Sequence, residues 1–210
     1  INHPSLIFTP QRVSKASEKI AKDSTYANAW KAIKSLAEES LESKDINKLD
    51  VLSLAYQMTG ETKYRDKIIT LLNSMIDRPH VDEEMILRKP QWRSELKMAN
   101  SAYKAALGFD AVYNDLSKGQ RIEIAQGFWD AICEPLLGDW LLEPSRIHSL
   151  NSMGHNWWTA CLGMGGVLAI SISNEVPKAA KSAKLAVESL PEWFDFAGDM
   201  VHNKAKTFDR

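Results

Sequence analysis

Cysteine is scarce in this sequence, and long apolar runs are absent. The two cysteines, Cys133 and Cys161, permit at most one disulfide and imply none. Neither belongs to a short-spaced cluster of metal ligands, so we expect no metal site, and nothing in the sequence calls for another cofactor. The longest apolar run, around residues 160–172, is too short and too rich in glycine to span a membrane. No signal peptide is apparent, although a chain that begins at Ile1 says little about its compartment.

An excess of charge of one sign is also missing. The formal net charge is −1 over 210 residues. Such a balance provides no overall electrostatic attraction to nucleic acid or to anionic lipid, so we expect neither nucleic acid nor a membrane as a partner. The hydrophobic content of 44% suits one soluble domain, or a large part of one, with enough apolar surface for a core.

Strand patterns are nearly absent, whereas helical periodicity recurs along the chain. Residues that commonly cap the N-termini of helices precede the periodic segments: Thr9 (followed by Pro10), Ser24, Asp45 and Ser117. Gly60 is typical of a helix end. Two proline-containing stretches, residues 78–92 and 138–154, are predicted to be irregular, and the last helical segments are predicted on either side of Pro191.

The predicted fold is all-α, with eight or nine helices paired as hairpins. No fixed-length repeat is evident, which disfavours a tetratricopeptide-like solenoid. The segment 159–173 is apolar on nearly every side, so it needs cover on every side. This favours two layers of helices, namely an α/α toroid built as an incomplete double ring of helical hairpins. The alternative is an irregular bundle around one central helix.

The strongest candidate site is the sequence GHNWW at residues 154–158, together with Asn151. It stands where an irregular stretch meets the apolar helix, and the first-turn N–H groups of a helix can receive a carboxylate. Asn151 and Asn156 can donate amide hydrogens to the same group, and His155 can move a proton near neutral pH. Trp157 and Trp158 offer flat faces to sugar rings. The alternative is structural: a capping asparagine, a satisfied histidine and core tryptophans.

Other candidates carry weaker signals. Arg93, beside Trp92, is either a partner for an anionic substrate or an ordinary surface charge. His148 lies in an irregular stretch of the kind in which sites often form. The glycines of GMGG (residues 163–166) follow no strand, so close helix packing explains them better than a phosphate loop.

The sequence resembles the heparinase II/III-like polysaccharide lyases and their alginate-lyase relatives. The likeness lies in four segments that together span essentially the whole chain: HPSLIFTPQRV, ELKMANSAYKAALGFDAVYNDLS, NSMGHNWWTACLGMGGVLAI and NKAKTFDR. The resemblance implies an α/α toroid followed by a β-sandwich region. It also implies cleavage of an anionic, uronic-acid-containing polysaccharide by β-elimination.

Carried over to this sequence, the resemblance assigns roles to the residues of the candidate site. Asn156 or Asn151 would neutralise the uronate carboxylate, and His155 would assist proton abstraction. Trp157 and Trp158 would shape the sugar-binding cleft. The family's doubled asparagine before the histidine is spaced out here, so the sequence does not decide which asparagine binds the carboxylate.

The family's catalytic tyrosine is expected after the segment into which NKAKTFDR leads. All five tyrosines precede the site motif instead: Tyr26, Tyr56, Tyr64, Tyr103 and Tyr113. We therefore interpret residues 1–210 as the N-terminal toroid domain of a larger lyase, ending before the tyrosine and the β-sandwich part, and we expect these residues alone to be inactive.

Two other classes of function stay open at this stage. A glycoside hydrolase on a similar toroid needs two carboxylates across a cleft, for which Glu95 and Asp110 are nominal candidates. A non-catalytic, carbohydrate-binding helical module needs none. A polymeric substrate crosses membranes poorly, so we expect a periplasmic or secreted protein. The sequence does not distinguish heparan sulfate from alginate or other uronates.

Overall fold

The computed structural model describes residues 1–78, 80–147 and 156–202, with side chains described up to residue 196. In this part of the chain the fold is all-α, as predicted, and no strand occurs. The helices, in chain order, are α1 (Pro10–Lys22), α2 (Ser24–Glu39), α3 (Leu49–Thr59), α4 (Thr62–Ile76), α5 (Glu83–Ile86), α6 (Leu96–Val112), α7 (Lys118–Phe128), α8 (Glu134–Trp140), α9 (Asn156–Ser171) and α10 (Pro177–His202). Short 3₁₀ turns stand at Ser40–Glu42, Ile46–Lys48 and Tyr113–Asp115, and a π-helical turn at Trp129–Cys133.

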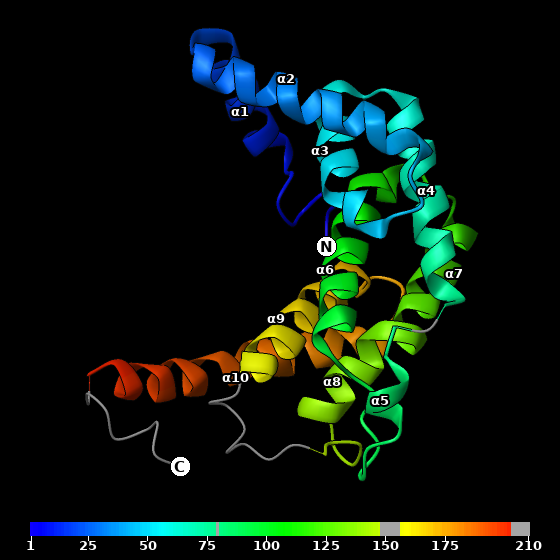
Figure 1. Cartoon of the computed structure of the whole chain (residues 1–210), viewed down its shortest axis with the longest axis vertical. Coiled ribbons are helices and arrows are strands. Elements are labelled where there is room, and N and C mark those ends of the chain that lie inside the picture. Colours follow the sequence, from blue (N-terminus) through cyan, green and yellow to red (C-terminus); the bar gives the residue numbers. More distant parts are fainter. Residues whose placement is uncertain (79, 148–155, 203–210) are drawn as a thin grey trace.

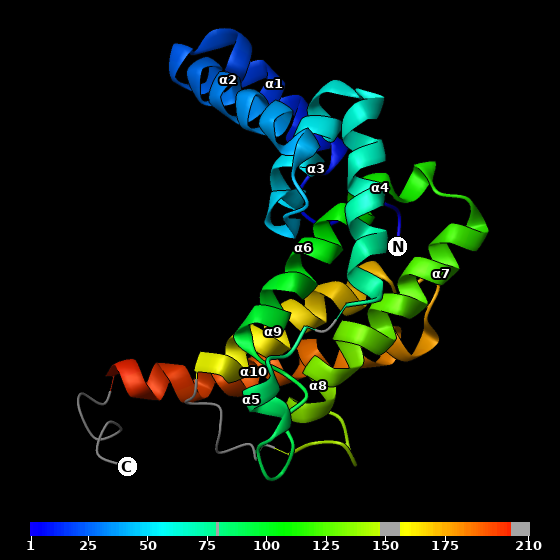
Figure 2. The ribbon, with the colours of Figure 1, turned by 45° about the vertical axis from the view of Figure 1, so that its right-hand side comes forward.

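Helix α6 is central to the packing, and it contacts α3, α4 and α9. Helix α4 also packs against α3 and α7, and α10 packs against α9. The α1–α2 hairpin lies at one end of this arrangement and α10 at the other, so that the helices follow an open arc (Figures 1 and 2).

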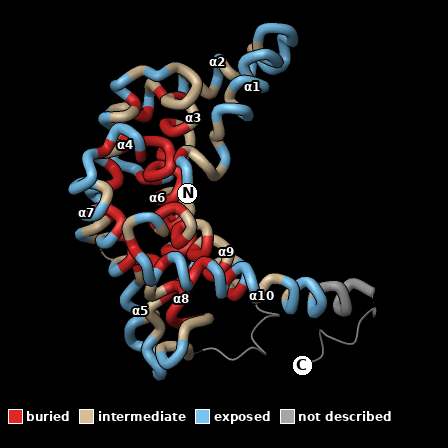
Figure 3. Tube along the Cα trace, turned by 180° about the vertical axis from the view of Figure 1, so that it is seen from behind, coloured by how far each residue is buried: buried red, intermediate tan, exposed pale blue. Residues whose placement is uncertain are grey.

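The core is concentrated in the middle of the arc, where α3, α4, α6, α8 and α9 meet (Figure 3). The apolar helix α9 is covered by α6, α8 and α10, which is the cover that its composition requires. The α1–α2 hairpin differs, because α1 has no buried residue and α2 has only Ala37. None of the described helices is long and apolar enough to cross a membrane.

Several predicted helix ends are confirmed. The Thr9 side chain accepts a hydrogen bond from the Arg12 backbone N–H (3.4 Å), with Pro10 at the first helical position. At the start of α7, Ser117 and Gln120 form a reciprocal capping box, which satisfies two backbone donors. Gly60 ends α3 with a φ of 69°, in the left-handed region that favours glycine.

The N-terminus of α2 was predicted one residue late. Asp23 caps this helix, and its Oδ1 accepts a hydrogen bond from the Thr25 N–H (2.7 Å), so Ser24 is the first helical residue. Asp45 caps a 3₁₀ turn that leads into α3. A carboxylate competes well with a hydroxyl for the orphan N–H groups of a first turn, because it also favours the positive end of the helix dipole.

Three predicted breaks are corrected. Helix α10 continues through Pro191, which is exposed, so the carbonyl that loses its proline partner can be hydrated. Residues 138–140 belong to α8 rather than to an irregular stretch, and residues 83–86 form the one-turn helix α5. Between α7 and α8, the π-helical turn ends at Cys133, two residues before Pro135, and a wider turn there relieves the clash of the proline ring with the preceding carbonyls.

Candidate functional site

The start of α9 carries the described part of the predicted site. Asn156 is the first residue of the helix and is exposed. Trp157 is half-buried, whereas Trp158 is 1% exposed and lies in the hydrophobic core. Its burial gives Trp158 the core role that the sequence left open. His155, Asn151 and His148 lie outside the described residues.

Trp157 belongs to a cluster of three tryptophans, Trp92, Trp140 and Trp157, which we call the tryptophan cluster. The Trp92 ring meets the Trp157 ring edge to face, with centroids 5.6 Å apart, and meets the Trp140 ring in the same manner at 6.4 Å. Trp140 is buried, while Trp92 and Trp157 each keep a partly exposed surface. The Arg88 guanidinium carbon stands 4.4 Å from the Trp92 ring centroid. The chain thus brings two sequence-predicted residues, Trp92 and Trp157, into direct contact.

Arg93 holds the segment that carries Trp92 against α8. Its backbone N–H and its Nε donate to the two carboxylate oxygens of Asp139, at 2.7 and 3.0 Å, and its Nη1 donates to Glu134 Oε2 at 2.7 Å. Nη2 is buried and has no hydrogen-bond partner among the described residues. Two carboxylates already compensate the Arg93 charge, which gives Arg93 a positioning role beside Trp92.

Two more residues complete this hydrogen-bonded network. The Ser94 hydroxyl donates to Asp139 Oδ2 (2.8 Å) and accepts from the Trp140 indole N–H (2.9 Å). Asp139 is fully buried, and these donors supply hydrogen bonds to both of its carboxylate oxygens. Asp139 and Ser94 were not singled out from the sequence, because an aspartate near a helix end and a lone serine have no distinctive pattern.

Gly138 allows the Arg93 side chain to pass across α8. A Cβ atom built on Gly138 would collide with Arg93 Nη2 and would lie 2.8 Å from Glu134 Oε1. The glycine therefore leaves space for the guanidinium group. No sequence pattern indicated this role, since the position is an ordinary helical one.

The two carboxylates considered for a hydrolase are not a catalytic pair. Glu95 precedes α6 and Asp110 lies near its end, and 15 intervening steps of 1.5 Å separate them by about 22 Å. A hydrolase pair stands about 5–10 Å apart. Glu95 is 5% exposed and accepts a hydrogen bond from the Asp82 N–H (2.9 Å), and burial raises its pKa.

Asp110 has a structural role at the other end of α6. Its carboxylate accepts hydrogen bonds from His3 Nδ1 (2.6 Å), from the Ser5 N–H (2.9 Å) and from the Leu6 N–H (3.0 Å). The His3 ring also stacks on Tyr113, with centroids 4.0 Å apart. Asp110 thereby fastens the N-terminal segment to α6.

The glycine-rich run in α9 serves packing at two of its positions. A Cβ on Gly165 would lie 3.1 Å from Leu137 of α8, and one on Gly166 would lie 3.2 Å from Ala186 of α10. Both cysteines are buried and free. In the described part of the chain, no group of three or more histidine, cysteine, aspartate or glutamate side chains could hold a metal ion.

The arrangement at the start of α9 suits an anionic ring. First-turn N–H groups lack partners inside a helix and carry partial positive charge, and Asn156, the first residue of α9, is exposed. Beside it, Trp157 and Trp92 present partly exposed aromatic surface. No known family model matches the sequence, and no curated protein matches it either.

Proposed function

We propose that this chain contributes the carboxylate-binding part of a polysaccharide lyase, which cleaves uronic-acid polysaccharides by β-elimination. The observation that carries the proposal is the exposed Asn156 at the first turn of α9, next to the contact between Trp157 and Trp92. An amide donor and an aromatic surface recognise the two parts of a uronate, namely its carboxylate and its ring.

The chemistry explains why a neutral amide is useful. The proton on C5 of a uronate is weakly acidic while the neighbouring carboxylate is negative. Hydrogen bonds to the carboxylate stabilise the enolate-like intermediate that forms when the proton leaves. In the proposed reaction His155 assists removal of the C5 proton, the C5–H electron pair forms the C4–C5 double bond, and the C4–O bond breaks.

The leaving oxygen must gain a proton, and we assign this step to no residue of the chain. Three of the tyrosine hydroxyls are engaged elsewhere: Tyr56 with Asp115, Tyr64 with Glu38 and Tyr113 with Glu175. These hydroxyls already donate to carboxylates, so they are poor candidates for a proton donor at the start of α9.

A proposal about the arrangement of the helices accompanies the proposed reaction. We infer that the arc of hairpins is an incomplete α/α toroid, with α3, α6 and α9 in its inner layer. The contacts of α6 with both α3 and α9 support this, as does the open arc in Figure 1. Because the proposed substrate is a polymer, we also propose a periplasmic or secreted location.

A carbohydrate-binding module without catalysis is the second candidate. The tryptophan cluster favours it, because partly exposed aromatic rings bind sugars without any proton transfer. The separation of Glu95 and Asp110 along α6 speaks against a hydrolase that uses these two groups.

The test uses the natural protein that carries this chain and a panel of uronate polysaccharides. The proposal predicts an unsaturated uronate product, followed by its ultraviolet absorbance. Asn156→Ala should lower kcat about 10²- to 10³-fold, as for the loss of one preorganised donor. Thr159→Ala, at an exposed position in the same first turns of α9, is the matched control and should leave the rate unchanged. Binding without any product would favour the module, and new reducing ends without a double bond would favour a hydrolase.

A further inference from the structure

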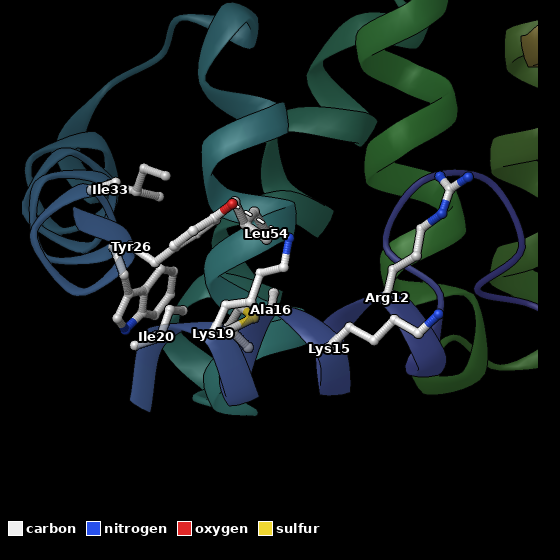
Figure 4. Close-up of a pocket in the computed structure, with 11 residues that line it drawn as sticks. Arg12, Lys15, Ala16, Lys19, Ile20, Tyr26, Ile33 and Leu54 are labelled. Atoms are coloured by element: carbon white, nitrogen blue, oxygen red, sulfur yellow. Dashed lines mark hydrogen bonds between the residues drawn. The ribbon is translucent and has the colours of Figure 1, made fainter. Parts of the chain in front are cut away.

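A cavity lies at the opposite end of the arc from α10, between α1, α2 and α3 (Figure 4). Its volume is about 370 Å³, which falls in the range of small-molecule sites. Each of the three helices contributes one face to it. The lining residues come from α1 (Arg12, Lys15, Ala16, Lys19, Ile20), from α2 (Tyr26, Ala29, Trp30, Ile33) and from α3 (Leu54, Met58).

The inner surface of this cavity is apolar. Its lining includes the aliphatic side chains of Ile20, Ile33 and Leu54, together with Met58 and the indole of Trp30. These side chains are only half-buried. Helix α1 buries no residue completely, so the apolar face of the hairpin lacks the cover that other helices of the chain have. An apolar ligand body placed here would gain the burial that the hairpin itself lacks.

The rim of the cavity is cationic. Arg12, Lys15 and Lys19 follow one another on a single face of α1, at spacings of three and four residues. Lys19 Nζ donates to the Tyr26 hydroxyl (3.3 Å), and Arg12 Nη1 donates to the Ile7 carbonyl at 3.5 Å. None of the three forms an ion pair with a carboxylate in the part of the chain that the structure describes. Three uncompensated positive charges thus border an apolar cavity.

We propose that the cavity binds a small amphipathic anion, with its apolar body against Trp30, Ile33 and Leu54 and its single anionic head group at Lys15 and Lys19. We choose this class of ligand because the cavity combines an apolar lining with a cationic rim. An apolar interior gives a hydroxyl-rich sugar no hydrogen-bond partners and leaves its polar groups unsatisfied. A neutral apolar ligand would give the three cations no anionic partner.

The experiment measures binding of decanoate to the 210-residue chain by isothermal titration calorimetry, below the micellar concentration of decanoate. Decylammonium, which has the same alkyl chain and the opposite charge, is the matched ligand. We expect decanoate to bind at least about tenfold more tightly than decylammonium, because the rim favours one sign of charge. A galacturonate trisaccharide serves as the purely polar anion.

Two variants test the rim and the interior separately. Lys15→Gln combined with Lys19→Gln should weaken decanoate binding about tenfold, since two favourable charge interactions are lost. Ala29→Phe fills the cavity from α2 and should abolish binding. The control combines Lys22→Gln with Lys31→Gln, which removes two exposed lysines of the same hairpin outside the lining and should leave binding unchanged. Circular dichroism confirms that each variant is folded.

Equal binding of decanoate and decylammonium would overturn the proposal, as would no binding of decanoate. Trisaccharide binding that is tighter than decanoate binding, that persists in the Asn156→Ala chain and that is lost with Lys15→Gln and Lys19→Gln would also overturn it, in favour of an electrostatic sugar site on α1. These results are independent of the start of α9, because Asn156→Ala leaves the cavity unaltered.

Discussion

Both oxygens of the Asp139 carboxylate accept hydrogen bonds from a single residue, Arg93, through its backbone N–H at 2.7 Å and its Nε at 3.0 Å. The pair joins the segment before α6 to helix α8. Because Trp92 precedes Arg93 directly and contacts Trp157, this pair sets the position of the partly exposed aromatic surface beside α9. The integrity of the proposed sugar-binding surface therefore depends on a buried aspartate that never touches a sugar.

Asp139→Ala should destabilise the fold strongly. The substitution leaves Arg93 short of a carboxylate and leaves the Ser94 hydroxyl without its acceptor, so we expect a loss of about 3 kcal/mol in the free energy of unfolding, measured with urea. Glu143→Ala removes an exposed carboxylate that stands 3.5 Å from Arg146, and its cost should stay below about 1 kcal/mol. Equal costs for the two variants would contradict the role given to Asp139.

A pair of glycine substitutions tests the space around Arg93. Gly138→Ala forces the guanidinium out of its position and should cost about 1–3 kcal/mol in unfolding free energy. Gly163→Ala lies inside α9, where an added Cβ meets no described residue within 4 Å, so it should be neutral or stabilising by up to about 1 kcal/mol. A Gly138→Ala variant as stable as the parent chain would show that Arg93 moves aside at no cost.

Asp110 should make the stability depend on pH on the acid side. Burial opposes its ionisation, but hydrogen bonds from His3, Leu6 and Ser5 outweigh this and lower the pKa of Asp110 below its ordinary value. A lowered native pKa contributes stability above the unfolded-state value of about 3.9, and this contribution is lost as the pH falls through the native pKa.

The measurement compares Asp110→Asn with the parent chain by urea unfolding at about pH 6 and about pH 3. We expect the free-energy difference between the two chains to be larger at the higher pH and to shrink as the parent chain becomes protonated. Asp66→Asn, at an exposed aspartate, controls for general effects of charge. A difference that stays constant between the two pH values would refute the assignment.

The two thiols should be inert in the folded chain. Burial raises the pKa of both Cys133 and Cys161, to about 12 for Cys161, so almost no thiolate exists near neutral pH. Iodoacetamide should modify neither thiol under native conditions and both in urea, as counted by mass spectrometry. Rapid native alkylation of either thiol would mean that α9 or the π-helical turn opens readily.

Local chemistry made much of the helical framework predictable from the sequence. Some helix ends depend only on residues that are close together in the sequence, and the structure confirms these ends. They are Thr9 with Pro10, the Ser117–Gln120 capping box and Gly60. Pro191 misled the prediction because the cost of a proline inside a helix depends on whether its surroundings are exposed.

The site was predictable only in part, because its geometry comes from distant segments. Trp92 and Trp157 were singled out separately, yet their contact follows from the packing of the whole chain. Asp139 had no distinguishing pattern, and neither had the cavity between α1, α2 and α3, whose lining looks like three ordinary amphipathic faces.

The most direct test of the central claim compares two ligands and two chains by calorimetry. The ligands are a uronate oligosaccharide and the same oligosaccharide with its carboxylates reduced to neutral alcohols, and the chains are the parent and Asn156→Ala. The account predicts that Asn156→Ala weakens binding of the uronate about tenfold, as for the loss of a charge-assisted hydrogen bond, and leaves binding of the reduced sugar unchanged. Equal effects on both ligands, or no effect on the uronate, would contradict the claim that Asn156 recognises the carboxylate.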